Sequence, residues 1–195
     1  MGNSDTSNLA RADRRFVTKA AELNMEEIRL SELAAQQATS PEVRAFAQQL
    51  VTDHTQASSE LSGIASRKGL TDLGREDYDQ RAVSKLGKKS GADFDKAYIE
   101  KMVDAHDDAI DLFEKASRNT QDPELQAFAS KTLTKLRQHQ QHAKGLEQTV
   151  SRGGSGMSGS SSSGMGTDAS GIGGSSGTSN STGAGTPSGT GTSRR

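Results

Sequence analysis

The sequence of 195 residues contains no cysteine. This absence excludes disulfides, thiolate metal sites and cysteine nucleophiles. Long apolar runs are also missing, and none approaches the roughly 18 residues that a transmembrane helix requires, so no membrane span is predicted. The first fifteen residues lack the apolar core of a signal peptide. We therefore expect no export signal in this sequence.

The sequence also lacks a strong charge of either sign. Its formal net charge is −1. The segment 151–195 contributes +2, which leaves −3 on the remaining residues. A mildly acidic chain does not have the basic surface that binds nucleic-acid phosphates. No nucleic-acid partner is therefore expected.

The last part of the chain has low complexity. Of the 45 residues in 151–195, 34 are glycine, serine or threonine. Such a segment cannot bury enough apolar surface to offset the entropy lost on ordering, so we predict a disordered tail. The rest is long enough for one domain with a single core. The predicted organisation is a lead-in at 1–12, a folded domain at 13–150 and the tail at 151–195.

An internal repeat organises the folded part. When the sequence is shifted by 82 residues, the segment from Asp13 aligns with the segment from Asp95, and Phe16 meets Tyr98. The same register continues without a gap into "SPEVRAFA" and "DPELQAFA", which begin at Ser40 and Asp122. Each half of the domain is therefore predicted to be one structural unit.

Each unit has the pattern of a helical hairpin. Ser40 and Asp122 are favourable N-cap residues, and each is followed by proline at the first helical position. Apolar periodicity predicts long helices over 7–39, 41–68, 92–119 and 123–150. The segment 69–91 is long enough to travel the length of a bundle, and a short helix is expected within it at 76–86.

Two similar hairpins joined by one long crossover predict an all-α, ferritin-like four-helix bundle. A plain up-down bundle would need only a short second connection. The alternatives are that up-down bundle, or an extended pair of hairpins that dimerises.

Each predicted long helix has one ionisable residue on its apolar stripe. These residues are Glu27, His54, His106 and His139. At about 1.5 Å per residue, a crossover of this kind places all four within one to two helical turns of the midplane of the bundle. The sequence therefore predicts that they cluster in the core.

Three imidazoles and a carboxylate are a suitable ligand set for a transition metal. Iron or manganese is expected, with zinc and copper as alternatives. Asp53 is included as either a ligand or a group that orients a neighbouring imidazole. Glu26, Asp107 and Asp108 flank the set. The alternative is that the histidines pair with Glu27 and Asp53 without any metal.

The sequence resembles a bacterial ferritin-like family known as domain of unknown function 4142. The resemblance covers Asp13 to Val150 and includes the Glu of "MEEIRL", the "DH" of "TDH", the "AH" of "DAHDD" and His139. It implies a ferritin-like fold, a site at these residues, and a location in the periplasm or cell envelope. Because no signal peptide is evident, the cytoplasm is the alternative location.

One departure from well-understood di-iron bundles limits the expected chemistry. Those proteins carry Glu-x-x-His motifs, whereas the residues three before His54, His106 and His139 are Val51, Val103 and Leu136. A ferroxidase or di-iron oxygenase of the usual kind is therefore not expected.

Three functions follow from these observations. The first is a metal-binding bundle with a role in stress or oxidative defence, handling peroxide or superoxide if the metal is redox-active. The second is a non-enzymatic envelope or surface protein whose histidines pair internally. The third is a binder of a small apolar ligand between the helices. The sequence leaves open whether the protein is an enzyme and whether it forms homo-oligomers.

Overall fold

The computed structural model describes residues 9–73 and 80–153, and these ranges contain five α-helices and no β-strand. The helices are α1 (Arg11–Gln37), α2 (Pro41–Arg67), α3 (Gln80–Gly87), α4 (Gly91–Asn119) and α5 (Pro123–Gly153). The prediction of an all-α helical bundle is therefore confirmed. None of the described helices combines the length and apolar character needed to cross a membrane.

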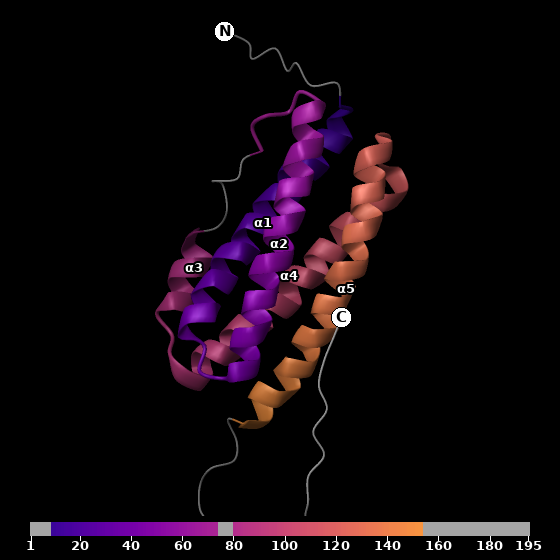
Figure 1. Ribbon diagram of the computed structural model, residues 1–195. Coiled ribbons are helices and arrows are strands. Elements are labelled where there is room, and N and C mark those ends of the chain that lie inside the picture. The colour runs from indigo at the N-terminus through magenta and orange to yellow at the C-terminus, as the bar shows by residue number, and fades with distance from the viewer. Residues whose placement is uncertain (1–8, 74–79, 154–195) are drawn as a thin grey trace, which may run out of the picture. The chain divides into compact units, whose positions relative to one another are not determined.

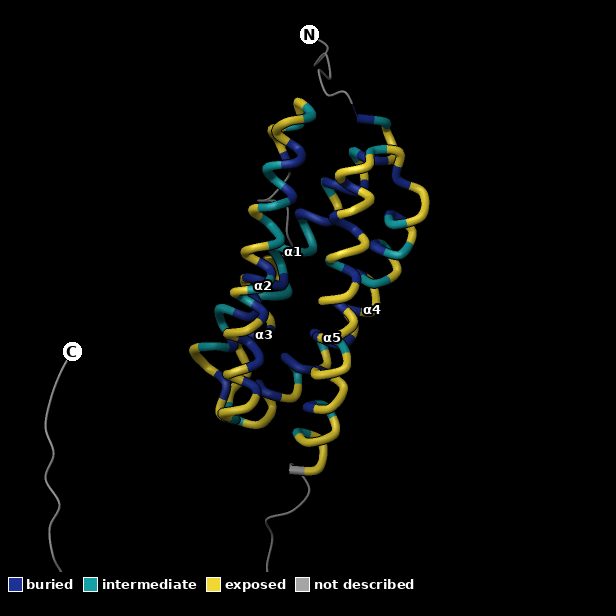
Figure 2. The backbone as a smooth tube through the Cα atoms, turned by 45° about the vertical axis from the view of Figure 1, so that its right-hand side comes forward, coloured by how far each residue is buried: buried dark blue, intermediate teal, exposed yellow. Residues whose placement is uncertain are grey.

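The four long helices form two hairpins that pack against each other (Figure 1). In the first hairpin α1 packs against α2, and in the second α4 packs against α5. Between the hairpins α1 contacts α4 and α2 contacts α5, while α3 lies against α1 and α4. Buried residues recur along each long helix in Figure 2, as expected for helices that turn one apolar stripe toward a shared interior.

The turn of the first hairpin is held by a carboxylate of the second. Asp95, near the start of α4, accepts hydrogen bonds from the backbone N–H of Thr39 (2.9 Å), the hydroxyl of Thr39 (2.6 Å) and the backbone N–H of Ser40 (2.7 Å). These groups bind Asp95 instead of continuing the helix, so α1 ends at Gln37, two residues before the predicted end. The start of α4 therefore lies beside the first turn.

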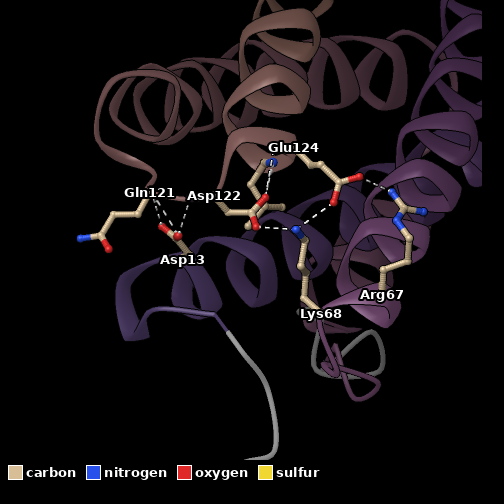
Figure 3. Close-up of polar contacts among 7 residues, drawn as sticks. Asp13, Arg67, Lys68, Gln121, Asp122 and Glu124 are labelled. Atoms are coloured by element: carbon tan, nitrogen blue, oxygen red, sulfur yellow. Dashed lines mark hydrogen bonds and ion pairs between the residues drawn. The ribbon is translucent and has the colours of Figure 1, made fainter.

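The turn of the second hairpin is held in the same way by the first. Asp13 in α1 accepts from the backbone N–H groups of Gln121 and Asp122 at 3.2 to 3.4 Å. Lys68, just after α2, forms ion pairs with Asp122 (2.7 Å) and Glu124 (2.9 Å), as Figure 3 shows. The end of α2 therefore lies beside the second turn.

The connection between the hairpins consequently runs from one end of the bundle to the other. It leaves α2 beside the second turn, includes α3, and enters α4 beside the first turn. Asp13 and Asp95 are 82 residues apart and occupy equivalent positions of the repeat. Each repeat thus binds the turn of the other.

The predicted caps explain why the second helix of each hairpin starts where it does. Ser40 accepts a hydrogen bond from Val43 N–H (3.3 Å) through its hydroxyl oxygen. Asp122 accepts from Glu124 N–H (3.0 Å) and Leu125 N–H (3.1 Å). Proline follows each cap and lacks the N–H that would otherwise need a partner.

Some element boundaries differ from the prediction. Helix α1 begins at Arg11 rather than residue 7, because the chain turns at Ala10 and the preceding Leu9 packs into the core. Helix α5 continues to Gly153 instead of ending at 150. Helix α3 covers 80–87, and the predicted helical residues 76–79 lie outside the described residues.

Most of the predicted tail also lies outside the described residues, which stop at 153.

Two apolar clusters fill the interior of the bundle. One, here called the Phe113 cluster, lies toward the second turn and includes Phe16, Leu61, Phe113, Phe128 and Leu136. The other, called the Tyr98 cluster, lies toward the first turn and includes Leu30, Phe46, Leu50, Tyr98 and Met102. Every long helix contributes to both clusters, so the interior is divided across its middle.

Candidate metal centre

A layer of buried ionisable residues lies where the two apolar clusters meet. One residue comes from each long helix: Glu27 in α1, His54 in α2, His106 in α4 and His139 in α5. None of the four is more than 4% exposed. Burying polar groups costs free energy unless they have hydrogen-bond or ionic partners. The contacts of these four side chains therefore indicate what the layer can bind.

The three histidines form a compact cluster. One ring nitrogen from each lies within 4.8 Å of the others, and the ring centroids are 5.4 to 5.6 Å apart. Such a cluster could hold one metal ion. Glu27 borders it, with Oε2 lying 3.2 Å from Nε2 of His54 and 3.5 Å from Nδ1 of His106.

The orientation of the His54 ring is fixed by Asn24, one turn before Glu27. The Asn24 amide nitrogen donates to the backbone carbonyl of His54 (2.7 Å), which leaves the amide oxygen facing the imidazole. Nδ1 of His54 lies 2.7 Å from that oxygen and must be the donor, because an amide oxygen can only accept. In neutral His54, Nε2 therefore carries a lone pair directed at the cluster.

The other two rings are oriented by the same logic. Nδ1 of His106 lies 2.9 Å from the backbone carbonyl of Met102 and donates to it, so the lone pair is on Nε2. Nε2 of His139 donates to the Asp53 carboxylate at 2.8 Å, so the lone pair is on Nδ1. Partners of this kind, which hold one nitrogen and free the other, are typical of histidines that bind metals.

The atoms left without partners are concentrated at the cluster. Among the described residues, five buried side-chain atoms make no hydrogen bond. Four of them are Glu27 Oε2, His54 Nε2, His106 Nε2 and His139 Nδ1, and the fifth is Ser62 Oγ. Buried polar atoms rarely lack a partner, and these four atoms, one from each long helix at one layer, could together hold a positive ion.

Burial dominates the electrostatics of the layer. It raises the pKa of Glu27 and lowers the pKa of His54 well below its usual range. It also lowers the pKa of His139, although the hydrogen bond to Asp53 acts in the opposite direction. His54 and His139 are consequently held neutral at physiological pH, which is the form that binds a metal.

Asp53 lies at the edge of the layer. It accepts from His139 and forms an ion pair with Lys135 at 3.3 Å. Burial raises the pKa of Asp53, but the hydrogen bond from His139 and the Lys135 ammonium outweigh this effect, and the pKa is lowered. Of the two roles expected for Asp53, the contacts fit the one that orients an imidazole.

The acidic residues expected to flank the set lie outside it. Glu26 pairs with Lys101 at 2.9 Å, Asp107 contacts Gln140 and Lys144, and Asp108 is exposed. His142 is also exposed, with its ring against Phe46 at a centroid distance of 4.8 Å.

Sequence reasoning missed two partners of the histidines. Asn24 was not singled out, although it lies on the same helix as Glu27 and three residues before it. The other partner is the Met102 carbonyl, which a sequence does not reveal, because every helical residue has a carbonyl at this position relative to a side chain four residues later.

The fold and the site together define an all-α bundle with a buried three-histidine cluster that could hold a metal. The chain belongs to the family described as domain of unknown function (DUF4142), which matches residues 1–146. The resemblance stated from the sequence is thereby confirmed.

A solved structure shares the fold. The chain is similar to a DUF305 fragment from Deinococcus radiodurans, with a TM-score of 0.64 and 14% sequence identity. The match covers 74% of this chain and 98% of that fragment. A search of curated proteins found no match. At this identity the similarity concerns the fold alone.

Proposed function

We propose that the protein binds one transition-metal ion between its two hairpins. His54, His106 and His139 supply three nitrogen ligands, and Glu27 supplies an oxygen. The observation that carries the proposal is the set of four unpaired buried atoms, one from each long helix. A cation satisfies all four at once, because each of them offers a lone pair.

The surrounding residues support this assignment. Asn24, the Met102 carbonyl and Asp53 each accept a hydrogen bond from the ring nitrogen that is not at the cluster. They hold the rings in place and set the tautomer before any ion arrives.

The repeat favours one ion over two. A second, symmetric site would need ligands 82 residues from each member of the first. Ala109 and Leu136 stand at the positions equivalent to Glu27 and His54, and Asn24 and Ala57 at those equivalent to His106 and His139. None of these four side chains is an imidazole or a carboxylate, so we propose a mononuclear centre.

Iron or manganese is the proposed metal, with zinc and copper as alternatives. Imidazole nitrogens suit all of these ions, and the carboxylate adds a hard ligand that favours iron and manganese. If it is redox-active, the bound ion supplies one-electron chemistry for a role in stress or oxidative defence. We also propose that the bundle has a ferritin-like fold and that the protein is located in the periplasm or cell envelope, as the resemblance implies, with the cytoplasm as the alternative.

The second candidate is a bundle whose polar layer is closed by a proton instead of a metal. The raised pKa of Glu27 favours it, because a protonated Glu27 can donate to Nε2 of His54 across 3.2 Å. This proton satisfies one histidine only. The lone pairs of His106 and His139 stay without a donor, so the metal accounts for more of the observations.

Elemental analysis of protein purified without an affinity tag tests the proposal. The wild type, a His54→Ala, His106→Ala double variant and a His142→Ala control are compared. His142 is the matched control because it is an exposed histidine one turn beyond His139. We expect about one ion per chain in the wild type and the control, and less than a tenth of that in the double variant.

Circular dichroism shows whether the double variant is folded. A His139→Gln variant, which keeps more of the side-chain volume, provides a second test if it is not. Sub-stoichiometric metal in the wild type, with a melting temperature that iron, manganese and zinc leave unchanged, would overturn the proposal and favour the proton.

A further inference from the structure

A cavity that opens to the surface lies directly beside the proposed metal centre. It has a volume of about 110 Å³ and is bordered by residues of all four long helices. One end is formed by Glu27, His54 and His139. The cavity extends from there into the Phe113 cluster, so it adjoins one side of the polar layer.

The walls of the cavity are mainly apolar. Ala20, Leu61, Phe113, Phe128 and Leu136 surround it. A single water needs only about 10–15 Å³, so the cavity has room for a molecule of a few heavy atoms. Apolar walls favour apolar molecules such as xenon over anions, because a buried charge without a partner is costly.

The repeat explains why the space is there. Ala20 on α1 is equivalent to Met102 on α4, which is fully buried in the Tyr98 cluster. The cavity is further lined by Ala57 and Ala109, the alanines that replace the ligands of a second, symmetric site. The small residues therefore leave open a volume that larger side chains fill at the equivalent positions of the other repeat.

The cavity reaches the surface between α2 and α5. Gln56 and Glu60 on α2, and Lys131 and Lys135 on α5, line this end. Glu60 and Lys131 form an ion pair across it at 2.7 Å, with side chains 36% and 65% exposed. Exposed pairs of this kind contribute little stability, so the entrance opens at small cost.

We infer that this cavity is the binding site for a small neutral diatomic molecule, of the class of dioxygen or nitric oxide, next to the metal. The inference rests on the proposed metal-binding function. The cavity itself is formed by its lining residues and does not depend on a bound metal. Iron and manganese take up to six ligands, so three nitrogens and one oxygen would leave room for such a ligand on either ion. The apolar walls select a neutral diatomic over superoxide, which is charged.

Two variants fill the cavity from two of the helices that line it, α1 and α2. Ala20→Met introduces the residue that the repeat carries at the equivalent position, and Ala57→Leu fills the space from α2. Ala35→Met is the control, because Ala35 is half-buried on α1 against the Tyr98 cluster and does not line the cavity.

The first measurement is xenon binding to the metal-free proteins by xenon NMR. We expect binding to the wild type and to Ala35→Met, and at least a tenfold weaker affinity in the two filled variants. No xenon binding to the wild type, or equal binding in the filled variants, would overturn the cavity as a binding site whatever the metal does.

The second measurement is the binding of nitric oxide to the ferrous proteins, followed by electron paramagnetic resonance. We expect an iron–nitrosyl signal in the wild type and in Ala35→Met. In the filled variants, iron content should stay within twofold while the nitric oxide association rate falls at least tenfold. An unchanged rate at full iron content would contradict the inference. If the wild type binds none of iron, manganese, zinc and copper, the proposed function fails and the xenon result alone decides the cavity.

Discussion

At Glu27, burial and charge act against each other. The side chain is 2% exposed and its Oε2 has no hydrogen-bond donor, so an ionised Glu27 destabilises the metal-free protein. The same negative charge is favourable beside a cation that three imidazoles bind. The residue thus lowers the stability of the metal-free state and raises the affinity for metal.

Glu27→Gln separates these two effects. The amide keeps the shape, removes the charge and can donate to His54, so the metal-free variant should be more stable than the wild type by about 1 to 2 kcal/mol at pH 8. Because the pKa of Glu27 is raised in the folded state, the gain should shrink as the pH falls and Glu27 takes up its proton. Urea unfolding measures the gain, and isothermal titration should show weaker metal binding in the variant. A destabilised metal-free variant would contradict this account of Glu27.

The lowered pKa values of His54 and His139 predict how stability depends on pH. In metal-free Glu27→Gln, the unfolded chain binds protons on these histidines near their ordinary pKa of 6.5, while the folded chain keeps them neutral. The free energy of unfolding should therefore fall as the pH is lowered from about 7.5 to about 5.5, by at most about 1.4 kcal/mol per pH unit for each histidine. Asp53 and Asp122, whose pKa values are lowered, titrate below this range. Unfolding curves at each pH that show rising stability would contradict the prediction.

At the scale of the helices, the two hairpins are joined by a reciprocal pair of carboxylates. Asp95 accepts three hydrogen bonds of 2.6 to 2.9 Å from the first turn, whereas the bonds that Asp13 accepts from the second turn are 3.2 to 3.4 Å long. The second turn has a further contact to the first hairpin, because Lys68 pairs with Asp122. The first turn therefore depends more strongly on its single carboxylate.

This asymmetry predicts unequal effects of removing the two carboxylates. Asp95→Ala should lower the free energy of unfolding by about 2 to 3 kcal/mol, and Asp13→Ala by about 1 kcal/mol. Asp93→Ala is the control, because Asp93 is exposed in the first turn of α4. Urea unfolding measures all three. An Asp13 variant that loses more stability than the Asp95 variant would show that these bonds do not hold the turns as described.

At the scale of the whole domain, much of the architecture is readable from local signals. The caps at Ser40 and Asp122, the prolines after them and the apolar stripes predict the long helices, and the 82-residue repeat predicts two hairpins. Helix boundaries were less predictable. The end of α1 depends on Asp95, 58 residues beyond Gln37, and a long-range contact of this kind leaves no local signal.

The residues of the candidate site could also be predicted from local signals in the sequence. Periodicity and depth select Glu27, His54, His106 and His139, because a polar residue on an apolar stripe is conspicuous. The orientation of the rings was not predictable, since it depends on Asn24 and on a backbone carbonyl. The cavity beside the site could not be predicted either, because it depends on which alanines face each other across the bundle.

X-ray absorption of the protein loaded with one equivalent of zinc tests the central claim most directly, because the spectrum reports the atoms bound to the ion. We expect three imidazole nitrogens at about 2.0–2.1 Å from the zinc and an oxygen at about 2.0–2.2 Å. One nitrogen should disappear in His106→Gln, while His142→Ala leaves the spectrum unchanged. A zinc ion surrounded mainly by oxygens, or a spectrum that His106→Gln does not alter, would contradict the claim that the buried histidines hold a metal.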